Sequence, residues 1–395
     1  MADPLRVLTL NSISSAGLER FPKGRYQVGA RIENPDAILV RSQDMHAMKI
    51  PACVRTIGRA GAGVNNIPVE KMSERGMPVF NAPGANANAV KELVIAGLLI
   101  AARNLAPALH FVHGLKGDDK TLHQLVEDGK KQFAGAELPG RTLGIIGLGK
   151  IGSLVADAAI KLGMNVLGYD PEITVDAAWS LPSQVKKAHS IEEVVKAADF
   201  VTVHVPLLDV TRNLINANRV KLMKKGAILL NFAREGIVNN AAVLEGLDGK
   251  HLHYYVCDFP AEKLAGHPRV VVLPHLGAST SEAEDNCAVM VADQVRDFLE
   301  NGNILNAVNF PDVVMPRESP YRVSIANANV PNMLGQISTA MAKSGLNIHN
   351  MLNKSKGDMA YTLVDVDSKV PAGAIERIGR IEGVLSVRYL PAVNQ

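Results

Sequence analysis

The stretch "RTLGIIGLGKIG", residues 141–152, decides the fold class of this chain. The strand-like run "LGII" leads into a turn with Gly147, Gly149 and Gly152 in the pattern G-x-G-x-x-G, and "IGSLVADAAIKLG" continues as a helix-like segment. In such a turn, the first two glycines let backbone amides approach a pyrophosphate at a helix N-terminus, and the third lets helix and strand pack closely. The stretch predicts an α/β fold with a doubly wound parallel sheet that binds a dinucleotide.

An acidic residue follows this turn at the expected distance. Asp170 closes the next apolar run, "NVLGYD", eighteen residues after Gly152. A carboxylate at this place accepts hydrogen bonds from the ribose hydroxyls of NAD and repels the 2′-phosphate of NADP. No arginine follows in "YDPEIT" to favour NADP. The pattern therefore predicts NAD as the cofactor, against the alternative of a tight turn in an ordinary βα unit.

Length and composition limit the number of domains and the classes of protein to which the chain can belong. The 395 residues correspond to two or three domains at about 100–200 residues each, and 47% of them are apolar. A net charge of +3 argues against a dedicated nucleic-acid binder, which carries a clustered basic field. The three cysteines are far apart in the chain, which predicts a reducing compartment and no metal site.

The N-terminal sequence and the apolar runs favour a cytoplasmic protein. The start "MADPLRVLTL" lacks the basic region and long apolar stretch of a signal peptide. The longest apolar run, Leu93 to Ala102, is half of the roughly 20 residues that a membrane helix needs. We therefore expect this run to be a buried helix, and we expect no association with a membrane.

Short runs rich in Val, Ile and Leu alternate with helix-like stretches, which is the rhythm of a parallel sheet with crossover helices. The strand-like runs include "RVLTL" (6–10), "AILVRS" (37–42), "VRTIGRAG" (54–61), "MPVFNA" (77–82), "NVLGYD" (165–170), "FVTVHVP" (200–206), "GAILLNFA" (226–233), "HYYVCDF" (253–259) and "RVVVLPH" (269–275). Longer helices are predicted at about 88–105 and 283–300. The alternation thus predicts a parallel-sheet architecture, with the rhythm interrupted by the helix at 88–105 and resumed after it.

The C-terminal part has a different pattern. Three prolines in ten residues, Pro311, Pro316 and Pro320, predict a linker. The segment from about 321 to 391 then reads strand, helix, strand, strand, helix, strand, which predicts a ferredoxin-like α+β module of about 70 residues.

Three residues with catalytic potential follow three successive strand-like runs: Arg234, Glu262 and His275. Parallel strands end at the same edge of a sheet, so the three side chains are expected on the cofactor side. An arginine fork suits a substrate carboxylate, and a carboxylate beside an imidazole orients it for proton exchange with a carbonyl or hydroxyl. Taken singly, each residue has an ordinary explanation: a salt bridge to Glu235, a surface carboxylate and a strand-end histidine.

The ordered set of motifs resembles the D-isomer-specific 2-hydroxyacid dehydrogenases over nearly the whole chain. The segments that carry the resemblance are "VRS" (40–42), "GRAGAGVNN" (58–66), "FNAPGANANAVKEL" (80–93), "GLGKIG" (147–152), "HVPL" (204–207), "NFAREGIV" (231–238), "DFPAE" (258–262) and "PHLGAST" (274–280). The resemblance implies a substrate-binding domain of residues 1–98 and 285–312, an NAD-binding Rossmann domain of residues 99–284, and a C-terminal module of residues 321–395 similar to an ACT regulatory domain.

The resemblance also implies roles for individual residues. The catalytic residues fall on Arg234, Glu262 and His275. Cofactor contacts fall on Gly147, Gly149, Lys150, Ile151, Gly152, Asp170, Val205, Phe232, Ala233, Arg234, Cys257, Asp258, His275, Gly277, Ala278 and Ala62. Substrate contacts fall on Arg41, Ser42, Arg59, Asn86 and Asn88. Three positions depart from the family pattern: Cys257 stands where an aspartate is usual, with Asp258 following it, and Glu235 and Asn332 stand where glycines are usual.

Several functions remain open from the sequence. Arg41 and Arg59 could bind a substrate phosphate, or they could form surface salt bridges. The ACT-like module predicts control by an amino acid through Asn327, Asn329 and Asn347, and pairing of sheet edges into a homodimer or homotetramer; the alternative is that these asparagines only cap and turn the backbone. A relative that acts on an unphosphorylated 2-oxo acid, and an NAD-sensing corepressor built on the same two domains, are the other candidates.

Overall fold

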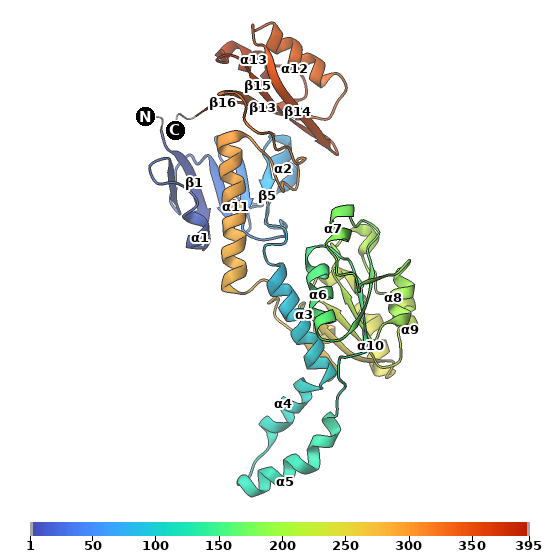
Figure 1. The fold of residues 1–395 in the computed structure, drawn as a ribbon. Coiled ribbons are helices and arrows are strands. Elements are labelled where there is room, and N and C mark those ends of the chain that lie inside the picture. The colour runs from blue at the N-terminus through green and yellow to red at the C-terminus, as the bar shows by residue number, and fades with distance from the viewer. Residues whose placement is uncertain (1–2, 393–395) are drawn as a thin grey trace. The chain divides into compact units, whose positions relative to one another are not determined.

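The computed structural model describes residues 3–392 of the chain, which divide into two compact units. Unit 1 comprises Met1–Asn86 and Ser281–Gln395, and unit 2 comprises Ala87–Thr280 (Figure 1). The sequence predicts the first crossing between domains near residue 98. It occurs earlier because residues 87–98 belong to a helix whose Val94 and Leu98 are fully buried in the core of unit 2.

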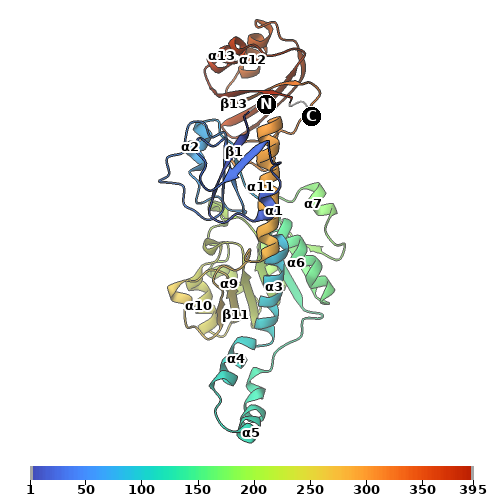
Figure 2. The ribbon, with the colours of Figure 1, turned by 90° about the vertical axis from the view of Figure 1, so that its left-hand side faces the viewer.

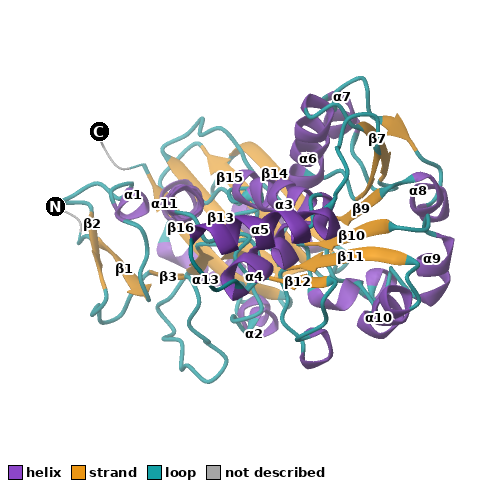
Figure 3. Ribbon diagram, turned by 90° about the horizontal axis from the view of Figure 1, so that it is seen from below, coloured by secondary structure: helices purple, strands orange, loops and turns teal. Residues whose placement is uncertain are grey.

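Unit 2 contains a parallel sheet with the strand order β12-β11-β10-β9-β6-β7-β8. The strands are β6 (Thr142–Ile146), β7 (Asn165–Tyr169), β8 (Lys186–Lys187), β9 (Phe200–Val203), β10 (Ala227–Asn231), β11 (Leu252–Cys257) and β12 (Val270–Val272). Most of these strands lie side by side in Figure 3. The strand order reverses direction next to β6, which is the switch point where doubly wound sheets bind ligands.

Helices cover both faces of this sheet. They are α3 (Ala87–Ala102), α6 (Lys150–Lys161), α7 (Val175–Trp179), α8 (Ile191–Ala197), α9 (Ala217–Leu222) and α10 (Asn240–Asp248). Successive residues of β11 alternate between the two cores: Tyr254 and Val256 pack with α3 and α6, whereas Tyr255 and Cys257 pack with α8, α9 and α10. Figure 2 shows α3 and α6 on one side of β11 and α9 and α10 on the other. Burial on both faces explains why these strands are continuous apolar runs.

A helical hairpin extends from this unit. It consists of α4 (Leu105–Gly114), α5 (Asp119–Gly129) and a 3-10 turn (Lys130–Phe133), and the rings of Phe111 and Phe133 pack 5.2 Å apart. The hairpin keeps large apolar side chains exposed, among them Leu109 at 61%. Within residues 3–392, no single helix is long and apolar enough to cross a membrane; α3 and α4, bent by 65°, reach that length only as a pair.

Unit 1 contains a second parallel sheet, with the strand order β2-β1-β3-β4-β5, and an antiparallel sheet, with the order β14-β15-β13-β16. The strands are β1 (Leu5–Leu10), β2 (Tyr26–Gly29), β3 (Ala37–Val40), β4 (Thr56–Arg59), β5 (Val79–Phe80), β13 (Tyr321–Ala328), β14 (Ile348–Lys356), β15 (Met359–Val366) and β16 (Val384–Pro391). The helices are α1 (Ser15–Leu18), α2 (Val69–Glu74), α11 (Ser281–Asn301), α12 (Met333–Ala342) and α13 (Ala372–Gly379). The predicted element order of the C-terminal module is confirmed.

The antiparallel sheet has apolar partners on both faces. One face packs with α12 and α13 through residues such as Val323, Ile325 and Val364. The other face, through Ala326, Tyr361 and Leu363, belongs to the same core cluster as Phe298 of α11 and Phe310. The Tyr361 hydroxyl also donates a 2.7 Å hydrogen bond to the carbonyl of Gly302. The C-terminal module is therefore part of the core of unit 1.

The proline-rich connection is packed, in contrast to the linker that its composition predicts. Val313 is fully buried and forms a bridge with Ile304. The fully buried Arg322 pairs with Asp365 at 2.6 Å and donates to the carbonyl of Met315 at 2.9 Å. The apolar residues between the prolines pack into the core, although the prolines by themselves predict a linker.

Candidate active site

The glycine turn of unit 2 is crowded on its inner side and open at its tip. Gly147 has φ +94°, and a Cβ there would lie 2.6 Å from the carbonyl oxygen of His204. A Cβ on Gly152 would lie 2.0 Å from the carbonyl oxygen of Gly147. A Cβ on Gly149, by contrast, would meet nothing within 4 Å, and Gly149 is the N-cap of α6 without a side-chain cap. The first amides of α6 can therefore receive an anion at this open position.

Asp170 braces the same turn. One carboxylate oxygen accepts a 2.8 Å hydrogen bond from the amide of Leu148, and the other accepts from the amide of Glu172 at 3.0 Å. A carboxylate offers about four acceptor positions, so these two bonds leave capacity for ribose hydroxyls. The sequence predicts the ribose contact but not the bond to Leu148, which joins residues twenty-two positions apart.

The other predicted cofactor residues differ in exposure. Lys150 is exposed and Ile151 is half-buried in the first turn of α6, while Val205, Ala233 and Ala278 are half-buried. Phe232 is only 5% exposed, because its ring packs against Gly97 of α3. The amide of Gly277 is buried as well. Contacts from these residues to a cofactor stay predictions.

Arg234 follows β10 and is exposed. Its guanidinium donates to the carbonyl of the preceding Ala233 at 2.7 Å. Within residues 3–392 it forms no ion pair with Glu235 or with another carboxylate, so the simple salt bridge that the sequence left open does not occur. An exposed guanidinium without a carboxylate partner can bind a substrate carboxylate through two parallel N–H···O bonds.

His275 and Glu262 lie beyond the ends of β12 and β11, which are neighbours in the sheet. Both side chains are exposed, and the imidazole makes an edge contact with the ring of Phe259 at 5.3 Å between centroids. In the part of the chain that the structure describes, no hydrogen bond or ion pair joins Glu262 to His275. The structure thus places the predicted pair on adjacent strand ends without bringing the two groups into contact.

Cys257 and Asp258 are buried, with 0% and 1% exposure. The thiol of Cys257 points into the apolar core and donates weakly to the carbonyl of Phe259 at 3.7 Å. Burial raises the pKa of this thiol, which keeps it neutral. Both oxygens of Asp258 accept backbone hydrogen bonds, from Leu276 at 2.7 Å and Gly277 at 2.8 Å. A cofactor contact from either side chain stays a prediction.

In unit 1, the two candidate phosphate-binding arginines lie at neighbouring strand ends. Val40 pairs with Arg59 in register, so Arg41 and Arg59 extend from the same edge of the sheet. The Arg59 guanidinium donates to the carbonyl of Arg41 at 3.0 Å, and Arg41 pairs with Glu284 at 2.6 Å. Arg41 is therefore engaged by a carboxylate, unlike Arg234.

Ser42 and Asn88, two further predicted substrate residues, and Ala62, a predicted cofactor residue, form hydrogen bonds within their own units. The amide of Ser42 donates to the side chain of Asn11 at 3.3 Å, and the backbone carbonyl of Ala62 accepts from the side chain of Asn81. In unit 2, Asn88 interacts with Lys91 and Glu92 on the first turns of α3. Asn86 lies at the last position of the first segment of unit 1.

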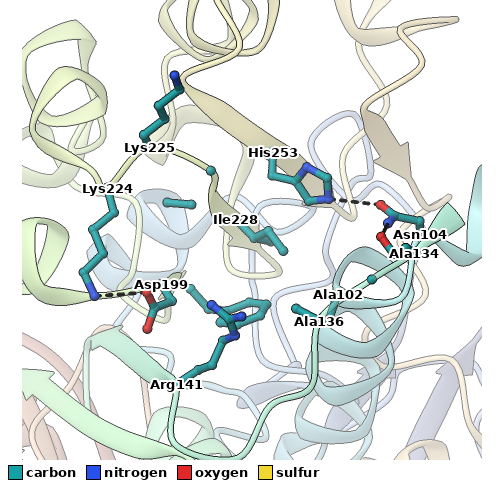
Figure 4. A pocket seen from close by; sticks show the side chains of 14 residues that line it. Ala102, Asn104, Ala134, Ala136, Arg141, Asp199, Lys224, Lys225, Ile228 and His253 are labelled. Atoms are coloured by element: carbon teal, nitrogen blue, oxygen red, sulfur yellow. Dashed lines mark hydrogen bonds and ion pairs between the residues drawn. The ribbon is translucent and has the colours of Figure 1, made fainter. Parts of the chain in front are cut away.

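A separate hollow of about 290 Å³ lies at the opposite edge of the unit 2 sheet, where β6, β9, β10 and β11 begin. Arg141, Asp199, Lys224 and His253 are among its lining residues (Figure 4). Lys224 pairs with Asp199 at 3.0 Å, and His253 meets Asn104 at 3.0 Å. Ligands of doubly wound sheets bind at the carboxyl ends of the strands, so this hollow is not the candidate site. Among residues 3–392, no cluster of His, Cys, Asp and Glu could hold a metal ion.

Known proteins resemble the chain throughout. Residues 98–277 match the family described as D-isomer specific 2-hydroxyacid dehydrogenase, NAD binding domain. D-3-phosphoglycerate dehydrogenase of Methanocaldococcus jannaschii is 34% identical over 408 aligned positions, covering 100% of this chain and 72% of that protein. The enzyme of the same name from Escherichia coli (strain K12) is 32% identical over 348 positions, covering 85% and 81%.

A solved structure has the same fold. The NAD⁺-bound 3-phosphoglycerate dehydrogenase of Entamoeba histolytica superposes with a TM-score of 0.60, covering 78% of this chain and 99% of that one, at 24% identity. At this identity the likeness concerns the fold alone.

Proposed function

The chain belongs to the D-isomer-specific 2-hydroxyacid dehydrogenases and is an NAD-dependent enzyme, and on this premise we propose that it oxidises 3-phospho-D-glycerate to 3-phosphohydroxypyruvate, the first step of L-serine biosynthesis. One observation carries the catalytic part of the proposal. The exposed Arg234 and His275 follow two strands of the sheet whose carboxyl edge also carries the glycine turn and Asp170. The substrate choice is supported by the relatives named D-3-phosphoglycerate dehydrogenase.

The residues of unit 2 would divide the chemistry as follows. The amides at the start of α6 bind the pyrophosphate, and Asp170 binds the ribose. Bound NAD supplies the acceptor for the hydride that leaves C2 of the substrate. Arg234 holds the substrate carboxylate and stabilises charge on the neighbouring oxygen. His275 accepts the proton of the 2-hydroxyl, and Glu262 stabilises the protonated imidazole once the two groups approach each other.

Arg41 and Arg59 are proposed to bind the 3-phosphate. Two guanidinium groups at neighbouring strand ends suit a dianion, because arginine binds phosphate oxygens in bidentate fashion. Glu284 holds Arg41 in the structure, so the phosphate must compete with this carboxylate. The preference for a phosphorylated substrate therefore depends on how easily the Arg41–Glu284 pair opens.

Turnover assays test the proposal directly. Purified protein is given NAD with 3-phosphoglycerate or with unphosphorylated D-2-hydroxy acids, and NADH formation is followed by absorbance. Arg59→Ala and Arg41→Ala should weaken use of 3-phosphoglycerate far more than use of D-glycerate, since a contact to a charged group contributes about 1.5–3 kcal/mol. Turnover of unphosphorylated acids alone would indicate another dehydrogenase of the family. Tight NAD binding without any turnover would indicate an NAD-sensing binding protein.

We further propose that the C-terminal module is an ACT-like domain that binds L-serine and pairs with a second copy. Asn332 has φ +64°, a conformation in which asparagine is among the few residues that replace glycine at low cost. Asn327 is buried, and its side-chain oxygen has no partner among the described residues. Its amide nitrogen donates to the carbonyl of Ala328 at 2.7 Å, whereas that of Asn329 donates to Gly357 at 3.0 Å.

The third asparagine lies elsewhere on the sheet. Asn327 pairs with Ala360 at one end of β15, whereas Asn347 accepts from the amide of Asp367 beyond its other end, roughly 23 Å away at about 3.3 Å per residue. A serine site that uses all three asparagines therefore requires a second copy of the module. Titration of L-serine against the wild type and Asn347→Ala, together with the molar mass in solution, tests this; full activity of the wild type at saturating serine would contradict it.

A further inference from the structure

Asp258 is the first residue beyond β11, and its carboxylate is turned toward the loop that carries His275. The side chain is 1% exposed. One oxygen accepts a 2.7 Å hydrogen bond from the amide of Leu276, and the other accepts a 2.8 Å bond from the amide of Gly277. These are the two residues that directly follow His275. A buried carboxylate is costly unless it is hydrogen-bonded, and these two amides stabilise it.

The loop needs such a restraint. His275 has φ +58°, a left-handed conformation that costs a residue with a side chain roughly 1–2 kcal/mol. The imidazole is exposed and makes an edge contact with the ring of Phe259, and among residues 3–392 it forms no hydrogen bond or ion pair. The direction of the imidazole is therefore set mainly by the backbone of its loop.

Two further features fit the loop to Asp258. The last sheet bond before the loop runs from the amide of Leu273 to the carbonyl of Cys257 at 2.8 Å, so the bonds on both sides of His275 end on consecutive residues, the last one of β11 and the one that follows it. A Cβ on Gly277 would lie 3.2 Å from the Asp258 carboxylate, which is closer than most real contacts of that kind. Glycine at 277 thus permits the short bonds.

We propose that Asp258 is a positioning residue of the active site, which acts by fixing the backbone next to His275. The inference rests on the proposed function, because it takes His275 as the proton-exchanging group. It differs from the cofactor contact that the sequence predicts for Asp258, since the side chain is only 1% exposed and both carboxylate oxygens accept bonds from the protein backbone. Asp258 then contributes to the reaction only through His275.

A double-mutant cycle separates these roles. Asp258→Asn keeps the size of the side chain but presents an N–H₂ group to one of the two amides, so one bond is lost. We expect kcat to fall about 10²-fold, the loss that a misplacement of about 1 Å produces. In the His275→Ala background the same substitution should change the residual kcat less than about threefold, because there is no imidazole left to misplace. The affinity for NADH, measured by fluorescence, should stay within about threefold of the wild type.

Asp199→Asn is the matched control. Asp199 accepts a backbone hydrogen bond from Thr142 at 2.8 Å and directly precedes β9, at the opposite edge of the same sheet; Figure 4 shows it paired with Lys224. Its substitution should lower the melting temperature without the kcat effect. If Asp258→Asn lowers kcat equally in both backgrounds, or weakens NADH binding tenfold, Asp258 acts directly on the cofactor or on general stability, and the inference is wrong.

Hydrogen exchange of backbone amides tests whether Asp258 holds the loop, and it does not require turnover. In peptides that span residues 270–280 of the wild type, the amides of Leu276 and Gly277 should exchange slowly, like the neighbouring sheet amides. Asp258→Ala should speed the exchange of these two amides by at least tenfold, whereas Asp199→Asn should not. Unchanged exchange in Asp258→Ala would overturn the inference. If the wild type oxidises no 2-hydroxy acid, the proposed function fails while this measurement still reports whether Asp258 holds the loop.

Discussion

Arg41 and Arg234 present the same guanidinium group in two different states. Arg234 is exposed and has no carboxylate partner among the described residues, whereas Arg41 is held by Glu284 at 2.6 Å. The Arg41–Glu284 pair is partly exposed, with 34% and 40% of the two side chains accessible. Such a pair contributes at most about 1 kcal/mol, so a dianionic ligand can displace it.

Replacement of Glu284 should therefore tune substrate preference. In Glu284→Gln the Arg41 guanidinium is released, and we expect KM for 3-phosphohydroxypyruvate to fall by up to about fivefold. KM for unphosphorylated hydroxypyruvate should change little, because it has no phosphate for Arg41 to bind. Steady-state kinetics with both substrates check this. An equal change for both would mean that Arg41 does not distinguish them.

His204 links a single residue to the pH dependence of stability. Burial lowers the pKa of this imidazole to about 4, and one ring nitrogen meets the Thr202 hydroxyl at 3.0 Å while the other has no partner among the described residues. Between pH 6.5 and 4 the unfolded state binds a proton that the folded state does not bind. The free energy of unfolding therefore falls as the pH decreases, by at most about 1.4 kcal/mol per pH unit from this group.

The variant His204→Gln removes this titration and keeps a hydrogen-bonding side chain. Urea unfolding of both proteins at several pH values between 7.5 and 4.5 should show that the wild type loses more stability than the variant as the pH falls. Other groups titrate equally in both proteins and cancel in the difference. A difference that stays constant with pH would mean that His204 is not held neutral.

At the scale of elements, the glycine turn joins β6 to α6 through two glycines with opposite surroundings. A Cβ on Gly152 would collide with the backbone of Gly147, whereas one on Gly149 would point into open space. Gly152 is needed for the packing of helix against strand, and Gly149 leaves room for a ligand.

Alanine at each position should separate these two effects. Gly152→Ala should lower the free energy of unfolding by about 1–3 kcal/mol, because the helix must move away from the strand. Gly149→Ala should leave stability within about 0.5 kcal/mol but weaken NAD binding, since the new methyl group occupies the open position. Thermal melts and NAD titrations of the two variants test this. Unimpaired NAD binding by Gly149→Ala would place the pyrophosphate elsewhere.

Sequence patterns predict helices and strands well where the buried residues repeat regularly along the element. The glycine turn and the helix at 283–300 are confirmed as β6–α6 and as α11. The predicted helix at 88–105 instead breaks before α4, because Asn104 adopts φ +52° and donates its side-chain amide to the carbonyl of Ala134 at 2.9 Å. Ala134 lies thirty residues from Asn104, so a pattern of neighbouring residues does not predict this hydrogen bond.

The same limit applies to the candidate site. The sequence predicts which side chains leave the carboxyl edge of the sheet, because strand ends are marked by polar residues after apolar runs. It does not predict that Asp258 binds the amides of Leu276 and Gly277, since those bonds depend on the neighbouring positions of β11 and β12. The prediction of a linker at the proline-rich segment is wrong for a similar reason, because Val313 is buried by residues distant in the sequence, which composition does not indicate.

At the scale of the whole molecule, a buried ion pair secures the C-terminal module within unit 1. Arg322 and Asp365 are both fully buried, and Arg322 also donates to the carbonyls of Met315 and Pro316. A second arginine, Arg388, lies 4.7 Å over the ring of Phe298 and donates to the carbonyl of Leu299 near the C-terminal end of α11 at 3.0 Å. These bonds satisfy carbonyls that would otherwise lack partners at a helix end.

Breaking the buried pair should destabilise all of unit 1. Arg322→Met leaves Asp365 unpaired, and we expect a loss of about 3–5 kcal/mol, whereas the double variant Arg322→Met/Asp365→Leu should recover much of it. Denaturant unfolding followed in both variants provides the measurement. A small loss in the single variant would show that the module contributes little to the stability of this unit.

The shared core of unit 1 has a consequence for the evolutionary exchange of gene segments. A recombination breakpoint within residues 311–320 would leave Phe298 and Phe310 uncovered on one product, and Tyr361 and Leu363 uncovered on the other. Both orphaned surfaces would favour aggregation unless the incoming segment matched them in shape. A chimera with a relative should therefore take both segments of unit 1, up to Asn86 and from Ser281 onward, from the same parent, with its breakpoints at the two borders of unit 2.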